Sequence, residues 1–344
     1  MIAILIINFR RALDTIECLD SLLQVHDPLF HIFLADNGSG GDAAALLSAY
    51  VDQYRERITL TLFAENYGFT GAHNRLFEQI VSDERRYKFV LLLNNDTVVE
   101  PHFLARMLER IDRAQHIEMV AARMMRYDDR TRIDNLGITF YKCGLASNRK
   151  STNDPLLGPC GGCALYTTDL LRRVHQATDE YFDEKFFCYA EDTDLAWRAA
   201  LLGYRAAFAD DALVYHKGSL ASGGPDNDFV LYHGVRNSLF VLIKCVPAYL
   251  IWPNLGWILL AHVAILLRHA LRGKIRIIGR LYRDFFRGAP AMWRKRRHLQ
   301  ECNPVRDFKI GLLVNHAFYE RAYIRQALLE IRGFFIPSLN RRDT

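Results

Sequence analysis

The chain has 344 residues, 50% of them hydrophobic and 24% charged, a composition that supports a sizeable folded core and excludes extensive disorder. Its formal net charge of +5 arises in the last third, around Arg268 to Arg297, whereas most acidic residues lie in the first two thirds. The seven cysteines are odd in number and scattered, and the apolar start has no basic residues before it, so we expect reduced thiols in a cytoplasmic protein.

The first part of the chain alternates short apolar runs with helical patterns. Strands are expected at residues 2–7, 31–35, 58–63 and 89–93, and helices at 14–23, 43–50 and 71–81. This alternation predicts an α/β fold with a mostly parallel central sheet. Ligands bind at the carboxyl ends of such strands, so the polar residues directly after them are site candidates: Asn8, Asp36, Asn37, Asn66, Asn94, Asn95 and Asp96.

The middle of the chain is less regular. Loops and short strands are expected at 126–165, a helix at 191–202 with Gly203 at its C-terminal end, and two strands at 204–209 and 212–215.

A loop containing Ser222-Gly223-Gly224-Pro225 then precedes a region of different composition. We therefore expect a first domain at residues 1–220 and a helical, basic region at 221–344.

The triplet Asn94-Asn95-Asp96 ends an apolar run, so the Asp96 carboxylate is expected at the sheet edge. We interpret Asp96 as a metal ligand, because one or two carboxylates suffice for Mg²⁺ when phosphate oxygens supply the remaining ligands. The alternative is that Asp96 or Thr97 caps a helix beginning near Pro101.

The segment from Asn66 to Asn74 opens a helix and contains Gly68, where a ligand can approach the backbone closely. A Gly-rich connection of this kind is also common as a simple turn. The same two interpretations apply to the turn after the second strand, in which Asp36 can accept a hydrogen bond from a base.

Three carboxylates, Glu191, Asp192 and Asp194, crowd a predicted helix start, where they complement the helix dipole. Because the aromatic run before them desolvates a carboxyl group and raises its pKa, Asp192 or Glu191 is the candidate general base. His216 follows another strand, and it is either a second metal ligand or an ordinary core or surface histidine.

In this order the motifs resemble those of family 2 glycosyltransferases of the GT-A fold, within the bacterial rhamnosyltransferase-like group. The resemblance covers roughly residues 2 to 240. It rests on Asn8-Phe9, Asp36-Asn37-Gly38-Ser39, Asn66-x-Gly68-Phe69-x-x-x-x-Asn74, Asn94-Asn95-Asp96, Gly161-Gly162, Glu191-Asp192-x-Asp194-Leu195-x-x-Arg198 and His216.

The resemblance implies that Asp36 recognises a pyrimidine and that Asp192, with Glu191 beside it, acts as the catalytic base. Asp96 is similar to the last carboxylate of the family's DxD metal motif, although the first carboxylate is here the amide Asn94, and His216 approaches the metal. The remaining donor-side residues implied are Asn8, Asn66, Gly68, Asn74, Asn94 and Asn95, and Arg236-Asn237 match a polar pair of no assigned role.

The activity so implied is an inverting transfer of a sugar, with rhamnose a candidate, from a dTDP- or UDP-sugar to a glycan or lipid-linked hydroxyl. It uses Mg²⁺ or Mn²⁺ and belongs to surface polysaccharide assembly. No G-x-G-x-x-G follows the first strand, which disfavours a dinucleotide-dependent oxidoreductase. The alternative is a non-catalytic nucleotide-binding or membrane scaffold protein, and no nucleic-acid partner is expected.

Residues 245–267 form an apolar stretch of nearly spanning length, which we expect to span poorly because Pro247, Pro253, Asn254, Gly256 and His262 interrupt it. The segment after it interleaves arginines with aromatic and aliphatic residues, a pattern typical of a basic amphipathic surface. The alternative is a buried helical hairpin. We expect peripheral attachment to the anionic inner face of the cell membrane.

The pair Cys160 and Cys163 has the spacing of half a zinc site. No second ligand pair at matching spacing is nearby, so we interpret both thiols as packing residues.

Overall fold

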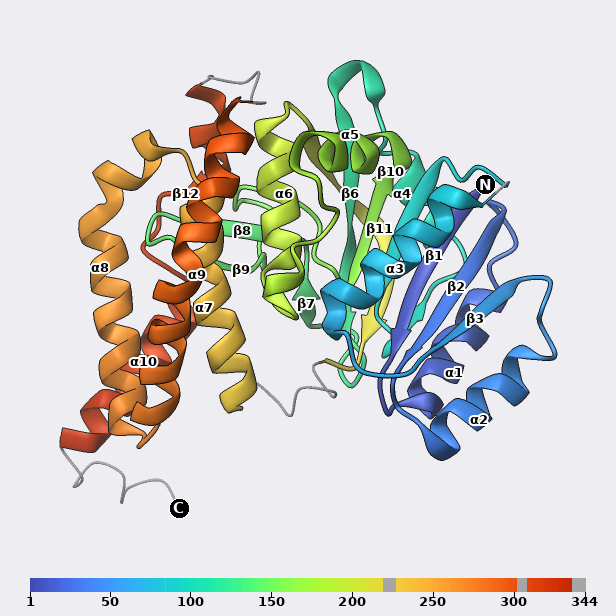
Figure 1. The fold of residues 1–344 in the computed structure, drawn as a ribbon, viewed down its shortest axis with the longest axis horizontal. Coiled ribbons are helices and arrows are strands. Elements are labelled where there is room, and N and C mark those ends of the chain that lie inside the picture. Colours follow the sequence, from blue (N-terminus) through green and yellow to red (C-terminus); the bar gives the residue numbers. More distant parts are fainter. Residues whose placement is uncertain (84, 219–226, 302–307, 336–344) are drawn as a thin grey trace.

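The computed structural model describes residues 1–83, 85–218, 227–301 and 308–335. The chain begins with alternating strands and helices, shown in blue to cyan in Figure 1. These are β1 (Ile2–Asn8), α1 (Ala12–Leu23), β2 (Phe30–Asn37), α2 (Gly41–Val51), β3 (Ile58–Phe63), α3 (Gly68–Ser82) and β4 (Phe89–Leu93). The α/β fold expected from the alternation is confirmed.

The middle of the chain completes the sheet. It contains β5 (Thr97–Val99), α4 (Phe103–Leu108), β6 (Ile117–Arg126), β7 (Ile133–Asn135), β10 (Cys163–Thr167), α5 (Thr168–Thr178), α6 (Glu191–Leu201) and β11 (Arg205–His216). Two short 3₁₀ turns lie at Arg113–Gln115 and Glu184–Phe186. Gly203, with a φ of 92°, follows the end of α6 as expected.

In the described part of the chain the strands form a nine-stranded sheet in the order β3-β2-β1-β4-β10-β6-β11-β5, with β7 beside β6. The pairs β3–β2, β2–β1, β1–β4 and β6–β11 are parallel, whereas β10 runs antiparallel between β4 and β6. The expectation of a mostly parallel sheet is thereby confirmed, and the carboxyl ends of β1, β2 and β4 meet at one edge.

Helices cover both faces of this sheet because β1 is apolar on both sides. Ile2, Ile4 and Ile6 pack in one cluster with residues of α1 and α2, and Ala3 and Leu5 pack in a second cluster with residues of α3 and α5. The alternation of side chains along a strand therefore builds two cores from one apolar run.

The two strands expected at 204–209 and 212–215 are a single strand, β11, so this prediction is wrong in detail. Its register with β6 shifts between Ala209 and Leu213, and Asp210 and Asp211 lie in this irregularity. There they form ion pairs with Arg123 and with Arg106, which accounts for polar residues inside a strand.

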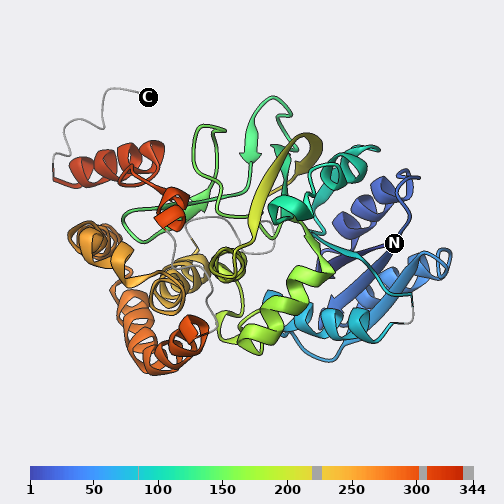
Figure 2. The same ribbon diagram turned by 90° about the horizontal axis from the view of Figure 1, so that it is seen from above.

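The C-terminal helices gather at the end of the molecule opposite β1, β2 and β3 (Figure 2). They are α7 (Asp228–Lys244), α8 (Ala248–Leu271), α9 (Ile275–Glu301) and α10 (Arg321–Phe335). A small sheet of β8 (Ile138–Tyr141), β9 (Ala146–Asn148) and β12 (Val314–Asn315) lies beside them, and a 3₁₀ turn at Phe308–Leu313 precedes β12.

Leu239 and Phe240 of α7 and Phe285 of α9 belong to the same buried cluster as β1 and α6. The boundary expected at residues 220/221 and the loop 222–225 lie outside the described residues.

The apolar stretch expected at 245–267 is one continuous helix, α8, with Pro253 inside it. Among the described residues it is the one helix long and apolar enough to cross a membrane, and 17% of its most apolar window is buried.

Candidate active site

Asn8 and Asp36 end the neighbouring strands β1 and β2, and the parallel register places them opposite each other. The Asn8 amide donates to Asp36 Oδ1 at 2.6 Å, and Asp36 Oδ2 accepts the Ser39 N–H at 3.0 Å. Asn8 is fully buried and Asp36 is 1% exposed. The hydrogen-bonding groups of both side chains thus have protein partners, and these bonds fix the turn after β2.

Asn95 connects this pair to the end of β4. Its amide donates to Thr15 Oγ1 at 2.9 Å and to Asn8 Oδ1 at 3.4 Å, and the Thr15 hydroxyl donates to Asn8 Oδ1 at 2.9 Å. The structure therefore brings together the polar residues that follow β1, β2 and β4 in one hydrogen-bonded network.

Gly68 begins α3 at a close approach between two segments. The Asn37 amide donates to Asn66 Oδ1 and to the Gly68 carbonyl, each at 3.0 Å, and Asn66 Oδ1 also accepts the Gly68 N–H at 2.8 Å. Gly68 has a φ of 70°, and a Cβ there would lie 2.4 Å from the Phe187 carbonyl oxygen. Two features therefore require glycine at this position: the backbone has a positive φ, and the Phe187 segment leaves no room for a side chain.

Asn74 lies in α3 and contacts the segment before α6. Its amide donates to the Phe182 carbonyl at 2.9 Å, and its Oδ1 accepts the Phe182 N–H at 3.0 Å. Both polar groups of the side chain therefore bind protein backbone, and the contact fixes α3 against the chain that leads to α6.

Asp96 and His216 lie together, as the interpretation of both as ligands of one metal requires. The His216 Nε2 is 3.2 Å from Asp96 Oδ1, and its Nδ1 is 2.7 Å from Asp134 Oδ2. Burial lowers the pKa of His216, but the hydrogen bonds to Asp134 and Asp96 offset this and raise it to about 9.

The helix-capping alternative for Asp96 and Thr97 is wrong. Thr97 lies in β5, where its hydroxyl donates to the Asn94 carbonyl at 2.7 Å. The next helix, α4, begins at Phe103 after His102, with no side-chain cap.

The donor set at this edge fits a divalent cation that brings further ligands with it. Among the described residues no group of three or more His, Cys, Asp or Glu is arranged to hold a metal alone. Asp96 Oδ1 and His216 Nε2 lie 3.2 Å apart, so both side chains would reach one cation bound between them. Diphosphate oxygens would complete such a site.

Asp192 lies in the first turn of α6, after Ala190. Its Oδ2 accepts the Gly161 N–H at 2.9 Å, and its Oδ1 accepts the Thr193 N–H at 2.6 Å. Burial raises the pKa of the Asp192 carboxyl above its usual value, and these hydrogen bonds offset only part of the shift. The side chain nevertheless keeps part of its surface exposed.

Glu191 is more enclosed than Asp192. It is 6% exposed, and its Oε2 has no hydrogen-bond partner among the described residues. Burial, followed by the charge of Asp192, raises the pKa of Glu191 well above its usual value. Burial thus favours the neutral form of Glu191, and Asp192, which is partly exposed, is the better placed of the two to meet a substrate.

Gly161 and Gly162 connect the two ends of the site. The Gly162 carbonyl accepts the Asn94 N–H at 3.0 Å, while the Gly161 N–H donates to Asp192. A Cβ at Gly162 would lie 3.5 Å from the Asn94 amide, and one at Gly161 would lie 3.1 Å from the Phe69 ring. The Asp96 segment and the Asp192 carboxylate thus lie on either side of two consecutive glycines.

Cys160 and Cys163, on either side of these glycines, are both buried. Their sulfurs lie 3.5 Å from that of Met124 and 4.0 Å from that of Met107, respectively, and burial raises the pKa of Cys160 to about 12. These contacts agree with the interpretation of both thiols as packing residues.

Sequence reasoning missed Asp134, which contacts His216 from 82 positions away. Asp134 lies in an irregular stretch of the sequence, where no motif or periodicity marks it. It also missed the part played by Asn237, which is fully buried against the segment before α6. The Arg236-Asn237 pair was visible in the sequence, but only the fold shows what it contacts.

Solved structures with the same architecture are transferases of sugars. The mannosyltransferase PcManGT from Pyrobaculum calidifontis, in complex with GDP-Man and Mn²⁺, is 16% identical with a TM-score of 0.51, over 88% of this chain and 85% of that one. S. aureus TarS 1-349, in complex with UDP-GlcNAc, is 17% identical with a TM-score of 0.53, over 87% and 90%.

GalNAc-T7, with UDP, GalNAc and Mn²⁺, is 12% identical with a TM-score of 0.57, and the match covers 83% of this chain but 55% of that one. A comparison with the curated proteins finds no match.

The sheet order, with its polar edge beside the ends of β1, β2 and β4, defines a GT-A-like fold. The sequence model of Glycosyl transferase family 2 matches residues 3–174, and that of Glycosyl transferase family group 2 matches residues 89–336. The chain belongs to glycosyltransferase family 2.

Proposed function

We propose that this enzyme transfers a sugar with inversion from a dTDP- or UDP-sugar to a hydroxyl of a glycan or lipid-linked acceptor, in surface polysaccharide assembly. dTDP-rhamnose is the first donor to test. The observation that carries the proposal is the Asp192 carboxylate, with a raised pKa, held by the Gly161 N–H next to the Asp96 segment.

In the proposed reaction Asp192 accepts the proton of the acceptor hydroxyl as that oxygen forms its bond to the anomeric carbon. The bond from the anomeric carbon to the diphosphate breaks, and the nucleoside diphosphate leaves with the electron pair. General-base catalysis of this kind contributes about 10²- to 10⁴-fold. Inversion follows from a single displacement on the face opposite the leaving group.

Asp96 and His216 would hold a divalent cation, which supplies charge to stabilise the leaving diphosphate. Mn²⁺ accompanies the nucleotide ligand in two of the structural neighbours, which supports this assignment. Asn8, Asp36 and Asn95 keep the strand ends in place around the donor.

A thermal-shift panel of UDP, dTDP, GDP and their sugars with Mg²⁺ or Mn²⁺ tests the proposal. A nucleotide at 100 times its dissociation constant stabilises the fold by about 2.7 kcal/mol. Asp96→Ala should abolish the metal-dependent part of the shift, whereas the exposed control Asp52→Ala should leave it unchanged. Full metal dependence in Asp96→Ala would overturn the metal assignment, and no shift with any nucleotide would overturn the proposed donor class.

We further propose that the enzyme attaches peripherally to the cytoplasmic face of the membrane through α8 and α9. Among the most exposed apolar side chains of α8 are Trp252, Leu259, Leu260, Val263 and Leu267, each at least half exposed. α9 adds exposed Arg276, Arg280, Arg283, Arg287, Arg294 and Arg297. Apolar and basic residues on adjoining helices suit the headgroup boundary of an anionic bilayer.

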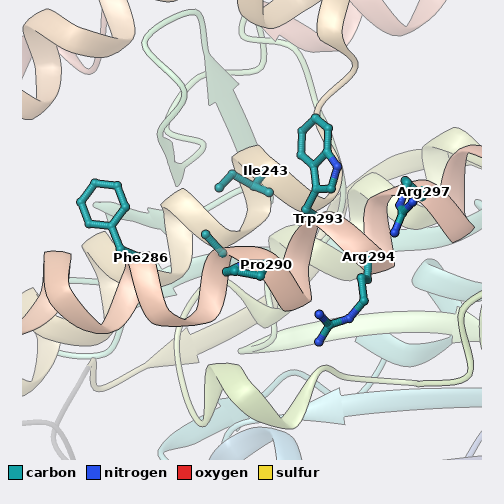
Figure 3. Close-up of a pocket in the computed structure, with 7 residues that line it drawn as sticks. Ile243, Phe286, Pro290, Trp293, Arg294 and Arg297 are labelled. Atoms are coloured by element: carbon teal, nitrogen blue, oxygen red, sulfur yellow. The ribbon is translucent and has the colours of Figure 1, made fainter.

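Figure 3 shows how these residue types alternate on α9. A shallow groove of about 510 Å³ is lined by Ile243 of α7 and by Phe286, Ala289, Pro290, Trp293, Arg294 and Arg297 of α9. Phe286 and Trp293 are 68% and 56% exposed, so α9 presents aromatic rings as well as guanidinium groups at the surface.

The packing of α8 favours attachment over spanning. α8 buries Ile258, Ala261 and Ile265, and it packs against α9. Insertion of α8 in this arrangement would carry the charges of α9, including Asp284 and its arginine partners, toward the hydrocarbon. A helix that lies in the headgroup region avoids this cost.

A further inference from the structure

The segment that leads into α6 has an unusual backbone. Phe187, Tyr189 and Ala190 have φ values of 63°, 72° and 63°, and none of them is glycine. Residues with a Cβ disfavour this half of conformational space, so neighbouring structure must hold the segment in place. Ala190 is the N-terminal cap of α6, and its carbonyl accepts the Asp194 N–H at 2.9 Å.

Asn237 of α7 makes the contacts that hold the segment. Its side-chain amide donates to the carbonyls of Phe186 at 2.9 Å, Cys188 at 2.8 Å and Tyr189 at 2.8 Å. These carbonyls converge on one amide group because the left-handed residues between them turn the backbone back on itself. One side chain thus contacts three carbonyls of this strained turn, and His233 Nδ1 and Arg236 Nη2 also lie 3.2 and 3.3 Å from the Phe186 carbonyl oxygen.

Arg236 fixes the orientation of that amide. Its guanidinium donates to Asn237 Oδ1 at 2.8 and 3.0 Å, and also to the Lys185 carbonyl at 2.9 Å. The oxygen of Asn237 is therefore occupied, and its nitrogen is left to face the carbonyls.

The same segment is held from the donor side. The Phe187 carbonyl accepts the Thr70 N–H at 3.2 Å, and the absence of a side chain at Gly68 allows it to come this close. The turn at residues 186–190 therefore forms hydrogen bonds with the start of α3 on one side and with the middle of α7 on the other. Asp192 follows two residues after it.

We propose that Asn237 is a positioning residue that holds the turn at 186–190 and thereby places Asp192 at the start of α6, an inference that rests on the proposed role of Asp192 as base. Asn237 is fully buried, so it does not itself touch a substrate. Its effect on the reaction passes through the backbone of the turn.

Hydrogen–deuterium exchange on the full chain tests the contact without knowledge of the acceptor. Asn237→Asp keeps the oxygen that accepts from Arg236 and removes the donor to the carbonyls. We expect the amides of 186–190 to exchange at least about tenfold faster in this variant, with β1 and β4 unchanged. Asn237→Ser, which keeps one hydroxyl donor, should show a smaller increase and serves if Asn237→Asp folds poorly.

The matched control is Ser238→Ala on the same helix, because the Ser238 hydroxyl donates only within α7, to the Gly234 carbonyl. Its exchange should equal that of the unchanged chain. Unchanged exchange at 186–190 in both Asn237 variants, or an equal increase throughout the chain, would overturn the proposal.

Release of nucleoside diphosphate from dTDP-rhamnose and UDP-GlcNAc tests the consequence for the reaction. Asn237→Asp should lower kcat about tenfold to a hundredfold with the donor KM unchanged, as expected for a misplaced reacting group. Adding Ala190→Gly should recover part of kcat, since glycine adopts the left-handed conformation without strain. A raised KM with unchanged kcat, or no recovery, would contradict a positioning role.

The pH profile separates positioning from loss of folded protein. If the turn relaxes, Asp192 loses part of the burial that raises its pKa, and the acidic limb of kcat should move to lower pH in Asn237→Ser, which adds no carboxylate that would raise this pKa. An acidic limb at the same pH would contradict the positioning role.

Asp192→Asn distinguishes failure of this inference from failure of the proposed function. Normal turnover by Asp192→Asn would overturn the base assignment whatever Asn237 does. An inactive Asp192→Asn beside a fully active Asn237→Asp would overturn the positioning role alone.

Discussion

Asp192 retains partial exposure, whereas Glu191 beside it is 6% exposed and strongly favours its neutral form. Only a group that reaches a substrate can take a proton from it. The two carboxyl groups, adjacent in sequence, are therefore expected to respond differently to the same isosteric change.

We predict that Asp192→Asn retains donor binding but lowers kcat about 10²- to 10⁴-fold, because an amide cannot accept the acceptor's proton. Glu191→Gln should be milder, since Glu191 is almost fully buried and its burial favours the neutral form, which glutamine resembles. Calorimetric donor titration and steady-state kinetics with one donor and acceptor measure both effects. Near-normal turnover by Asp192→Asn would overturn the assignment of Asp192 as the base.

Gly68 supports a prediction about stability. Gly68→Ala should destabilise the fold by about 1–3 kcal/mol, because its Cβ would lie 2.4 Å from the Phe187 carbonyl oxygen at a φ of 70°. Thermal or urea unfolding measures the change. The control is Gly234→Ala in α7, where no atom lies within 4 Å of the added Cβ and alanine should stabilise by up to about 1 kcal/mol. Equal effects of both changes would contradict the close approach.

Residue types and strand ends could be predicted from the sequence, but the contacts between them could not. Asn8, Asp36 and Asn95 were expected at one edge because parallel strands end together, and they do meet there. Asp134 contacts His216 across 82 positions, and Asn237 contacts the turn before α6 across about 50, pairings that only the folded chain defines. The periodicity of a sequence does not show which residues far apart in the chain will be in contact.

At the scale of elements, α6, α7 and α9 meet in a buried cluster of charges. Lys244 at the end of α7 is 1% exposed and contacts Asp194 of α6 at 2.9 Å and Asp183 at 3.2 Å, besides Glu180. Lys295 of α9 also contacts Asp183, at 2.7 Å. The cluster links the C-terminal helices to the chain around the candidate base.

We predict that Lys244→Met destabilises the fold by about 3–5 kcal/mol, because it removes the cation that contacts Glu180, Asp183 and Asp194 together, and Lys295 and Arg198 offset their buried charge only in part. The matched control Arg55→Met removes an exposed pair with Asp52 and should cost at most about 1 kcal/mol. Urea unfolding at neutral pH measures both. A loss no larger than that of the control would show that the cluster contributes little.

The same pair of variants has a predictable pH dependence. Burial raises the pKa of Asp183, but Lys244 and Lys295 more than offset this and lower it to about 2, below its ordinary value of 3.8. A depressed carboxyl pKa contributes stability that is present above the unfolded value and lost as the pH falls through the folded one. The difference between the unchanged chain and Lys244→Met should therefore shrink between about pH 4 and pH 2.

The elements themselves were predicted where apolar periodicity was strong. β1 and β4 match their expected spans because buried strands read as continuous apolar runs, whereas β11 was divided in two because Asp210 and Asp211 occur inside it. α8 was expected to be interrupted, yet its helix continues through Pro253. Proline lacks the backbone N–H that would bond to the preceding turn, but the hydrogen bonds of the neighbouring turns maintain the helix around Pro253. Local composition does not reveal this.

At the scale of the whole molecule, the C-terminal helices lie at one end and the β1–β3 units at the other (Figure 2). The exposed apolar residues of α8 and the arginines of α9 are thus separated from the strand edge that holds Asp36. In the proposed attachment, the end formed by α8 and α9 would therefore meet the lipid surface, and the strand edge with Asp36 would face away from it.

We predict that the full chain pellets with anionic but not with neutral liposomes, and that binding weakens as salt rises. The double change Arg287→Glu with Arg294→Glu should reduce binding, at about 1 kcal/mol for each basic residue lost near the surface. Arg55→Glu, at the other end of the molecule, is the control. Indifference to anionic vesicles would make α8 and α9 a protein-facing surface, and resistance to both high salt and carbonate would indicate an inserted helix.

Cys188 lies inside the turn that Asn237 holds, and it is the one partly exposed thiol among the described cysteines. Burial raises its pKa well above the usual value, so the native turn keeps this thiol protonated and slow to react. The rate at which this thiol is alkylated therefore measures how often the turn opens. A reagent added during turnover would report, at one sulfur atom, how often the segment before Asp192 leaves its strained conformation.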